Sequence, residues 1–461
     1  MRRAIAAAVI GGLTLGGAMA APSFAATPAT AANTMKTVIY DGYEFQVPAS
    51  WPVYRLDQYP QTCVRYDVPA VYLGQPGPNM QCTAGQVGRT ETVSFIPGGE
   101  GLPGTGAGSP GQEPGGAQLA RLPAVNAIVM QHAVQHELSV SLGPATSSPA
   151  AQGATVLGTY GTAPALIERV LSTLQVAPAS AAPTAQTAPA SAQPGGTSPG
   201  TSRNGAAASR PVQIDQSSRV SPPPLRAIVK VTTKTAPAPV GGFDACTTPS
   251  LATMHVLRGN YAAVGVYIGG ANAACAYGNL SPSWVQQVIA WGWGILPTYS
   301  GPQAPCWTGT GVKLDASKAA AEGTAAGADA VSKARAFGFG AGSPIYYDME
   351  AYAGAPSCNT AVLTFLGAWD RQVAAGGYVT GVYSSLDPGI DNMQAAAGRV
   401  AGFTPPDAVW IALWDSKPTV PSGPLWPLSD RSKQYAGNLT ASYEGITLNV
   451  DKDAVDGPMV R

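Results

Sequence analysis

The sequence contains few charged residues. Only 11% of its 461 residues are Asp, Glu, Lys or Arg, and the 26 basic side chains balance the 26 acidic ones. A nucleic-acid partner requires a basic surface that neutralises phosphates, so this composition argues against one. It also argues against a polybasic surface for anionic lipids. Uncharged polymers such as glycans fit the composition better.

Motifs of several common enzyme classes are missing as well. No phosphate-binding G-x-x-x-x-G-K-[ST] loop or G-x-G-x-x-G turn follows a predicted strand, which disfavours a nucleotide enzyme. No G-x-S-x-G elbow joins a predicted strand to a helix, which disfavours a Ser-His-Asp hydrolase. The chain has three His and no C-x-x-C pair. His132 and His136 are four residues apart, and on a helix they would face one another as an ordinary surface pair. We therefore expect neither a metal nor a cofactor.

The first 25 residues are typical of a signal peptide. Two arginines precede an apolar run of small residues, and cleavage sites end at Ala20 and Ala25. An uncleaved membrane anchor is the alternative, and Sec and Tat export are not distinguished. No later segment approaches the roughly 18 apolar residues of a membrane-spanning helix. We expect a secreted, soluble and monomeric mature chain, extracellular or associated with the cell wall.

Three regions differ in composition. Residues 36–176 predict a small α/β domain, in which a hairpin turns at Asp41-Gly42 between two alternating strands. Residues 177–239 are rich in Ala, Pro, Ser, Thr and Gly, which is the composition of a linker. In residues 240–461, short apolar runs alternate with helix-like stretches, as in a parallel α/β sheet or barrel.

The C-terminal region has eight candidate strands. This number predicts a compact, TIM-like (β/α)8 barrel near the lower size limit for that fold. The later connections are too short for full helices, so that half of the barrel is expected to be irregular. The strands are Gly242–Asp244, Ala263–Ile268, Trp293–Tyr299, Pro344–Met349, Val379–Tyr383, Val409–Leu413, Ser432–Tyr435 and Leu448–Asp451.

Six cysteines in an exported protein predict three disulfides, although sequence alone leaves their pairing open. Two of them stand alone in the N-terminal region, and four follow successive strands of the barrel. Pairs between consecutive loops are favoured there, which would pin the loops that line a cleft. The favoured pairs are Cys63 with Cys82, Cys246 with Cys275, and Cys306 with Cys358.

Acidic residues stand at the ends of several strands. Asp348 and Glu350 close an apolar strand, and because side chains alternate along a strand, the two should point the same way. Asp244 ends the first strand and Asp451 the last, and these strands are neighbours in a closed barrel. Catalytic sites of such barrels lie at the C-terminal strand ends, where paired carboxyls can divide the roles of acid and base. A solvated pair of acids on a loop is the alternative.

Other candidate side chains surround these acids. Aromatic rings at strand ends can stack on sugar rings, although packing in the core or at the rim is the alternative for each of them. Asp415 lies just beyond the sixth strand. The aromatic candidates are Tyr267, Tyr299, Tyr383 and Trp414.

The C-terminal half resembles the actinobacterial glycoside-hydrolase-like family catalogued as domain of unknown function 1906. The resemblance rests on the segments Gly242–Cys246, Val264–Gly270 and Tyr346–Glu350. More distantly it resembles glycoside hydrolase family 25 lysozymes. Those enzymes have an Asp after strand one, Asp-x-Glu after strand four, Trp-Ile-Ala on strand six, Gln-Tyr on strand seven and an Asp in strand eight. The corresponding residues here are Asp244, Asp348, Glu350, Trp410–Ala412, Gln434-Tyr435 and Asp451.

The resemblance implies the role of each residue. Glu350 would be the general acid, and Asp348 would steady positive charge at the reacting carbon or its neighbouring acetamido group. Asp244 and Asp451 would tune and position them, and Gln434 would contact the substrate. We therefore expect a hydrolase that acts on a cell-envelope glycan such as peptidoglycan. A non-catalytic glycan-binding or wall-associated protein on the same barrel is the alternative.

Overall fold

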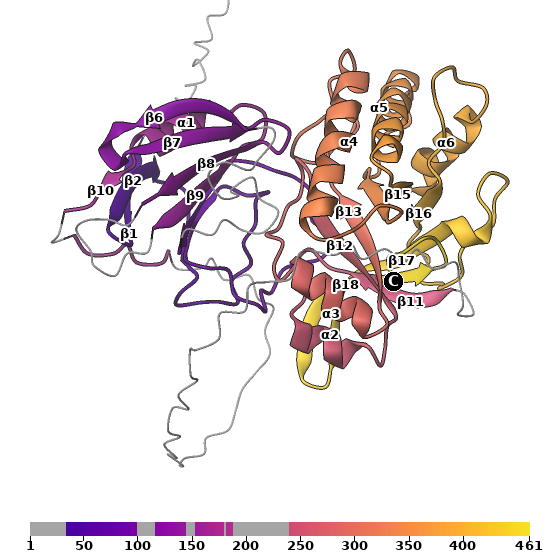
Figure 1. The fold of residues 1–461 in the computed structure, drawn as a ribbon, viewed down its shortest axis with the longest axis horizontal. Helices are drawn as coiled ribbons and strands as arrows, with labels where there is room; N and C mark the ends of the chain where they lie inside the picture. Colours follow the sequence, from indigo (N-terminus) through magenta and orange to yellow (C-terminus); the bar gives the residue numbers. More distant parts are fainter. Residues whose placement is uncertain (1–33, 99–115, 144–152, 179–180, 188–238) are drawn as a thin grey trace, which may run out of the picture.

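The structure is a computed structural model that describes residues 34–98, 116–143, 153–178, 181–187 and 239–461. The predicted signal peptide and most of the predicted linker lie outside these residues. Figure 1 shows two parts, an N-terminal pair of sheets in indigo and magenta and a C-terminal barrel in pink to yellow.

Eight strands of the C-terminal region close into a barrel in chain order. All eight predicted strands are present, and the last two are longer than expected. Their side chains alternate between the interior and the surrounding helices. The strands are β11 (Val240–Asp244), β12 (Ala263–Gly269), β13 (Gly294–Tyr299), β14 (Pro344–Asp348), β15 (Val379–Ser385), β16 (Ala408–Ala412), β17 (Arg431–Tyr443) and β18 (Ile446–Val455).

Helices cover the first half of the barrel. Ser250 and Ser281 cap α2 and α3, each accepting a hydrogen bond from a backbone N–H three residues later. The helices α4 and α5 lie side by side in Figure 1, and Gly323 allows their close approach, because a Cβ there would lie 2.2 Å from the carbonyl oxygen of Phe365. The helical elements of this region are α2 (Leu251–Leu257), α3 (Pro282–Ala290), α4 (Ala319–Ala336), α5 (Pro356–Ala375), η2 (Leu386–Ile390), α6 (Asp391–Ala396) and η3 (Leu428–Asp430).

The second half of the barrel departs from a regular (β/α)8 fold, as the short connections predicted. The strand β18 runs antiparallel to both β11 and β17, so the expectation of eight parallel strands was wrong. The reason is the two-residue turn Glu444-Gly445, in which both residues have positive φ (46° and 84°). Such a turn matches the twist of an antiparallel hairpin, whereas a parallel pair needs a long crossover.

The N-terminal region forms two sheets. Three strands pair in the order β1-β2-β10, and seven pair in the order β3-β4-β5-β9-β8-β7-β6. The predicted turn at Asp41-Gly42 is confirmed, with φ of 49° and 78°. The elements are β1 (Met35–Tyr40), β2 (Tyr43–Pro48), β3 (Val53–Arg55), β4 (Ala70–Leu73), β5 (Thr92–Pro97), β6 (Ala117–Leu122), η1 (Pro123–Val125), β7 (Ala127–His132), β8 (Glu137–Leu142), β9 (Ala154–Thr159), α1 (Ala165–Ser172) and β10 (Gln175–Val176).

The two histidines of this region lie in a hairpin and not on a helix. His132 ends β7 and is buried, and His136 lies in the turn before β8 with a positive φ. The expected surface pair was therefore wrong. From the same turn, Gln135 donates a hydrogen bond to Asp329 of α4, so this hairpin contacts the helical layer of the barrel.

No helix in the described part of the chain is both long enough and apolar enough to span a membrane.

Candidate active site

Three predicted acids meet inside one end of the barrel. Asp244 on β11 is paired directly with Asp451 on β18, and both are almost fully buried. Asp348 ends β14 and is also buried, at 1% exposure. The residues next to it, Tyr347 and Met349, pack outward in the core beneath the helices, so alternation turns Asp348 inward. The expected gathering of acids from distant strands is therefore present.

Gln434 of β17 lies at the centre of this group. Its Nε2 donates to Oδ2 of Asp244 at 2.9 Å and to Oδ2 of Asp451 at 3.2 Å. Its Oε1 accepts hydrogen bonds from the Tyr383 hydroxyl at 2.8 Å and from Trp414 Nε1 at 2.7 Å. Both ends of the amide are used, so the orientation of Gln434 is fixed and it links two acids to two aromatic side chains.

Glu350 follows Asp348 and is partly exposed. Its position is set by Gln303, a fully buried residue that the sequence analysis missed. Gln303 Oε1 accepts the backbone N–H of Glu350 at 2.7 Å, and its Nε2 donates to the carbonyl oxygen of Asp348 at 2.8 Å. Gln303 lies in the irregular loop after β13, where no periodicity signals its role.

The acids raise one another's pKa values. Burial, and then the charge of Glu350, raises the pKa of Asp348 well above its ordinary value. Burial also raises the pKa of Glu350 to about 7, and the charge of Asp451 acts in the same direction. The pKa of Asp451 rises to about 6, chiefly through burial. Burial and the charge of Asp451 raise the pKa of Asp244 strongly. The site therefore retains protons near neutral pH.

Asp453 is a fifth acid that the sequence analysis did not select. It lies on β18 two residues after Asp451, so alternation turns both side chains into the barrel. Trp410 Nε1 donates to its Oδ1 at 3.1 Å. Burial, followed by the charges of Asp244 and Asp451, raises its pKa well above the ordinary value. The spacing that linked Asp348 to Glu350 would also have indicated Asp453.

The predicted substrate-contacting residues separate into two groups. Tyr267 and Tyr383 are partly exposed and lie beside the acids, whose charges add to burial in raising the pKa of each hydroxyl. Trp414 is 54% exposed and is held by Gln434. Tyr299, by contrast, is fully buried, and its hydroxyl donates to Asp329 of α4. It therefore points away from the acids, towards the helices.

Asp415 also lies apart from the acids. Its Oδ1 accepts a hydrogen bond from Lys433 Nζ at 2.6 Å. This ion pair lowers the pKa of Asp415, and the Lys433 side chain is buried against the loop. Asp415 thus holds a loop at the rim of the barrel.

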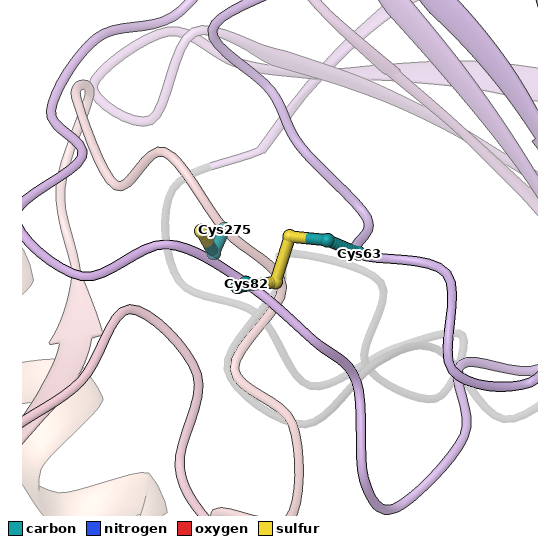
Figure 2. Close-up of side chains that lie close together, drawn as sticks. All are labelled: Cys63, Cys82 and Cys275. Atoms are coloured by element: carbon teal, nitrogen blue, oxygen red, sulfur yellow. A yellow bond between two sulfur atoms is a disulfide. The ribbon is translucent and has the colours of Figure 1, made fainter. Parts of the chain in front are cut away.

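The three favoured disulfides are confirmed: Cys63–Cys82, Cys246–Cys275 and Cys306–Cys358. Among the described residues, one group of possible metal ligands lies close together, namely Cys63, Cys82 and Cys275. Figure 2 shows these side chains and the bond between the first two. All three sulfurs are oxidised in disulfides, so they lack the thiolates that a metal site needs.

The closed barrel, with several carboxyls at one mouth, defines a glycoside hydrolase-like barrel domain. Residues 256–455 match the family described as "Rv2525c-like, glycoside hydrolase-like domain". This match confirms the resemblance predicted from the sequence. No curated protein matches the chain in sequence.

Several solved structures are similar to the barrel half of the chain. An uncharacterized protein of B. stearothermophilus is 16% identical, with a TM-score of 0.35 over 47% of this chain and 96% of that one. The Mycobacterium tuberculosis Tat-secreted protein Rv2525c is 15% identical, with a TM-score of 0.33 over 48% and 96%. The Clostridium perfringens spore cortex lytic enzyme SleM is 12% identical, with a TM-score of 0.33 over 48% and 68%.

Proposed function

We propose that this protein is an exported glycoside hydrolase that acts on a cell-envelope glycan. The observation that carries the proposal is the pair formed by the buried Asp348 and the partly exposed Glu350, whose pKa is raised to about 7. A carboxyl that keeps its proton near neutral pH can protonate a leaving oxygen. The three disulfides fit an oxidising compartment outside the cytoplasm.

In this proposal Glu350 is the general acid because it is the more accessible of the two. Asp348 lies beneath it, and the side chains of Ser300 and Glu350 interact with its carboxyl group. In this role the Asp348 carboxyl would accept an acetamido N–H of the substrate or balance positive charge at the reacting carbon. Formation of that charge would favour the ionised form of Asp348.

The remaining acids would set the proton balance. Asp244 and Asp451 share the donor Nε2 of Gln434, and the charge of Asp451 raises the pKa of Glu350. Tyr267 and Tyr383 would border the sugar that occupies the site. A neutral glycan fits this arrangement, because an additional negative charge would meet the repulsion of several carboxyls.

A non-catalytic glycan-binding barrel is the second candidate. The low exposure of Asp244 and Asp348, 2% and 1%, favours this candidate. In the first proposal these two acids would act on a substrate only through Glu350 or after a movement of the site.

The test is hydrolysis of purified peptidoglycan and of simpler glycans by the mature protein, measured as new reducing ends. The Glu350→Gln variant should lose at least about 100-fold in rate, the range expected for loss of a general acid. Glu444→Gln is the matched control, because it makes the same chemical change at an exposed hairpin turn. Equal rates for Glu350→Gln and wild type would remove Glu350 from this role. Binding without turnover by the wild type would favour the second candidate.

A further inference from the structure

A segment of the N-terminal region lies on the rim of the barrel beside the acids. This rim segment comprises residues 84–88, and it begins two residues after the disulfide-bonded Cys82. The backbone N–H of Ala84 donates to Oδ1 of Asn449 on β18 at 2.6 Å. Gly85 follows with a φ of +64°, and a Cβ there would lie 3.1 Å from Oδ2 of Asp451. Because Gly85 is exposed, this part of the rim segment lies at the surface beside an acid of the site.

The rim segment continues across the next strand ends. The carbonyl oxygen of Gln86 lies 3.9 Å from Sγ of Cys246, in the loop after β11. Val87 bridges to Ala273, in the loop after β12. A Cβ on Gly88 would lie 2.3 Å from the carbonyl oxygen of Thr310, in the loop after β13. The segment thus contacts four consecutive strands or their loops, in the order β18, β11, β12 and β13.

Two features anchor the rim segment. The disulfide Cys63–Cys82 abuts the barrel disulfide of Cys275, with the sulfurs of these three residues within 4.8 Å of one another (Figure 2). Directly after the segment, Arg89 is buried, pairs with Glu137 at 2.6 Å and donates from Nη2 to the carbonyl oxygen of Ala273 at 3.1 Å. A segment bounded by a disulfide and a buried ion pair is held in place on the barrel.

The order of strands gives this contact a consequence for the substrate. In the closed barrel, each of β18, β11, β12 and β13 lies opposite one of β14, β15, β16 and β17. Any polymer crossing the centre of the mouth must therefore leave it over one covered strand. We propose that the rim segment is a wall that closes one side of the barrel mouth, so that the site takes the end of a glycan chain and not its middle. This inference rests on the proposed function.

The proposed role of the rim segment can be tested by measuring binding to glycans that are immobilised through opposite ends. A soluble peptidoglycan glycan fragment of several disaccharide units would be immobilised through its reducing or its non-reducing end. The full-length mature Glu350→Gln protein would then be passed over both surfaces. We expect binding to one surface and at least tenfold weaker binding to the other. Equal binding to both surfaces would show that the rim segment does not block one end of the glycan, while the proposed glycan binding would stand. If the protein bound neither surface and did not bind the free fragment, both the proposed function and the proposed role of the rim segment would be rejected.

A variant in the rim segment gives a second readout. Asn tolerates positive φ, so Gly85→Asn should fold and place an amide against Asp451. We expect the preferred surface to lose at least tenfold in affinity while the melting temperature stays unchanged. Thr83→Asn is the matched control, because Thr83 is an exposed neighbour outside the rim segment. Unchanged affinity in Gly85→Asn would show that the rim segment does not border the bound glycan.

Discussion

Gln434 donates a hydrogen bond from Nε2 to Oδ2 of Asp244 at 2.9 Å. The same nitrogen donates to Asp451, so one amide separates two acids that are paired across β11 and β18. Without this donor, the repulsion between the Asp244 and Asp451 carboxyl groups would increase, and the backbone N–H of Asn438, which donates to Oδ1 of Asp451 at 2.6 Å, would remain as a donor to the pair. Gln434 is therefore central to the stability of the site as well as to its proposed chemistry.

The Gln434→Glu variant keeps the shape of the side chain and replaces a donor with an acidic group. We expect a loss of about 1–3 kcal/mol in the free energy of unfolding at pH 7.5, the cost of unsatisfied buried polar groups. The loss should shrink at pH 5, where protons return to the acids. Urea denaturation at both pH values measures it, and Gln286→Glu on the exposed face of α3 is the control. A uniform loss at both pH values would contradict the prediction.

The raised pKa of Glu350 predicts a pH dependence of stability. Its pKa is about 7 in the folded protein and 4.5 ordinarily, so the folded state binds the proton more tightly than the unfolded chain. The stabilisation is complete below pH 4.5 and is lost as the pH rises through about 7. Wild type should therefore lose more stability between pH 4.5 and 8 than Glu350→Gln does. Parallel stability curves for the two proteins would show that Glu350 is not perturbed in this way.

Gln303 should act as a positioning residue for the acid pair. Replacing it with the similarly sized Met removes the hydrogen bonds to the backbone of Asp348 and Glu350. Small displacements of a reacting group can cost about 100-fold in rate, so we expect kcat to fall by up to that factor while KM changes little. The pH–rate profile should shift as well. Gln287→Met, at an exposed position of α3, is the control.

The buried ion pair Arg89–Glu137 should contribute more to stability than an exposed pair. The side chains of Arg89 and Glu137 are 0% and 1% exposed, whereas Asp57, paired with Arg55, is 40% exposed. Glu137→Gln should cost about 3–5 kcal/mol, because a charged guanidinium stays buried without its counter-ion. Asp57→Asn should cost less than about 1 kcal/mol. Denaturant titration compares them, and equal costs would contradict the prediction.

The sequence predicted the barrel well because its strands are apolar runs bounded by turns. Alternation also indicated that Asp348 points inward. The same argument, applied to β13, would have turned Tyr299 outward together with Ile295, which is buried in the core beneath the helices. It would also have added Asp453 to the acids. Tyr299 was therefore assigned to the wrong side of its strand and Asp453 was missed, although both strands were recognised.

Other parts of the site depend on long-range contacts that no local pattern records. Gln303 lies in an irregular loop, and the direction of β18 depends on a two-residue hairpin turn within a polar stretch. The rim segment lies hundreds of residues from Asn449 and Asp451 in the chain, and its loop shows no periodicity. The helix expected at His132 and His136 was wrong because a spacing of four residues also occurs across a hairpin turn, here the turn between β7 and β8.

The sequence by itself determined the strands and the acids at their ends, because side-chain alternation and turn chemistry act over a few residues. The tertiary structure alone decided how many acids share one mouth, which amides hold them and which segment covers half of the rim. Those outcomes depend on closure of the barrel and on contacts between its loops and the N-terminal region, which bring together residues far apart in the chain.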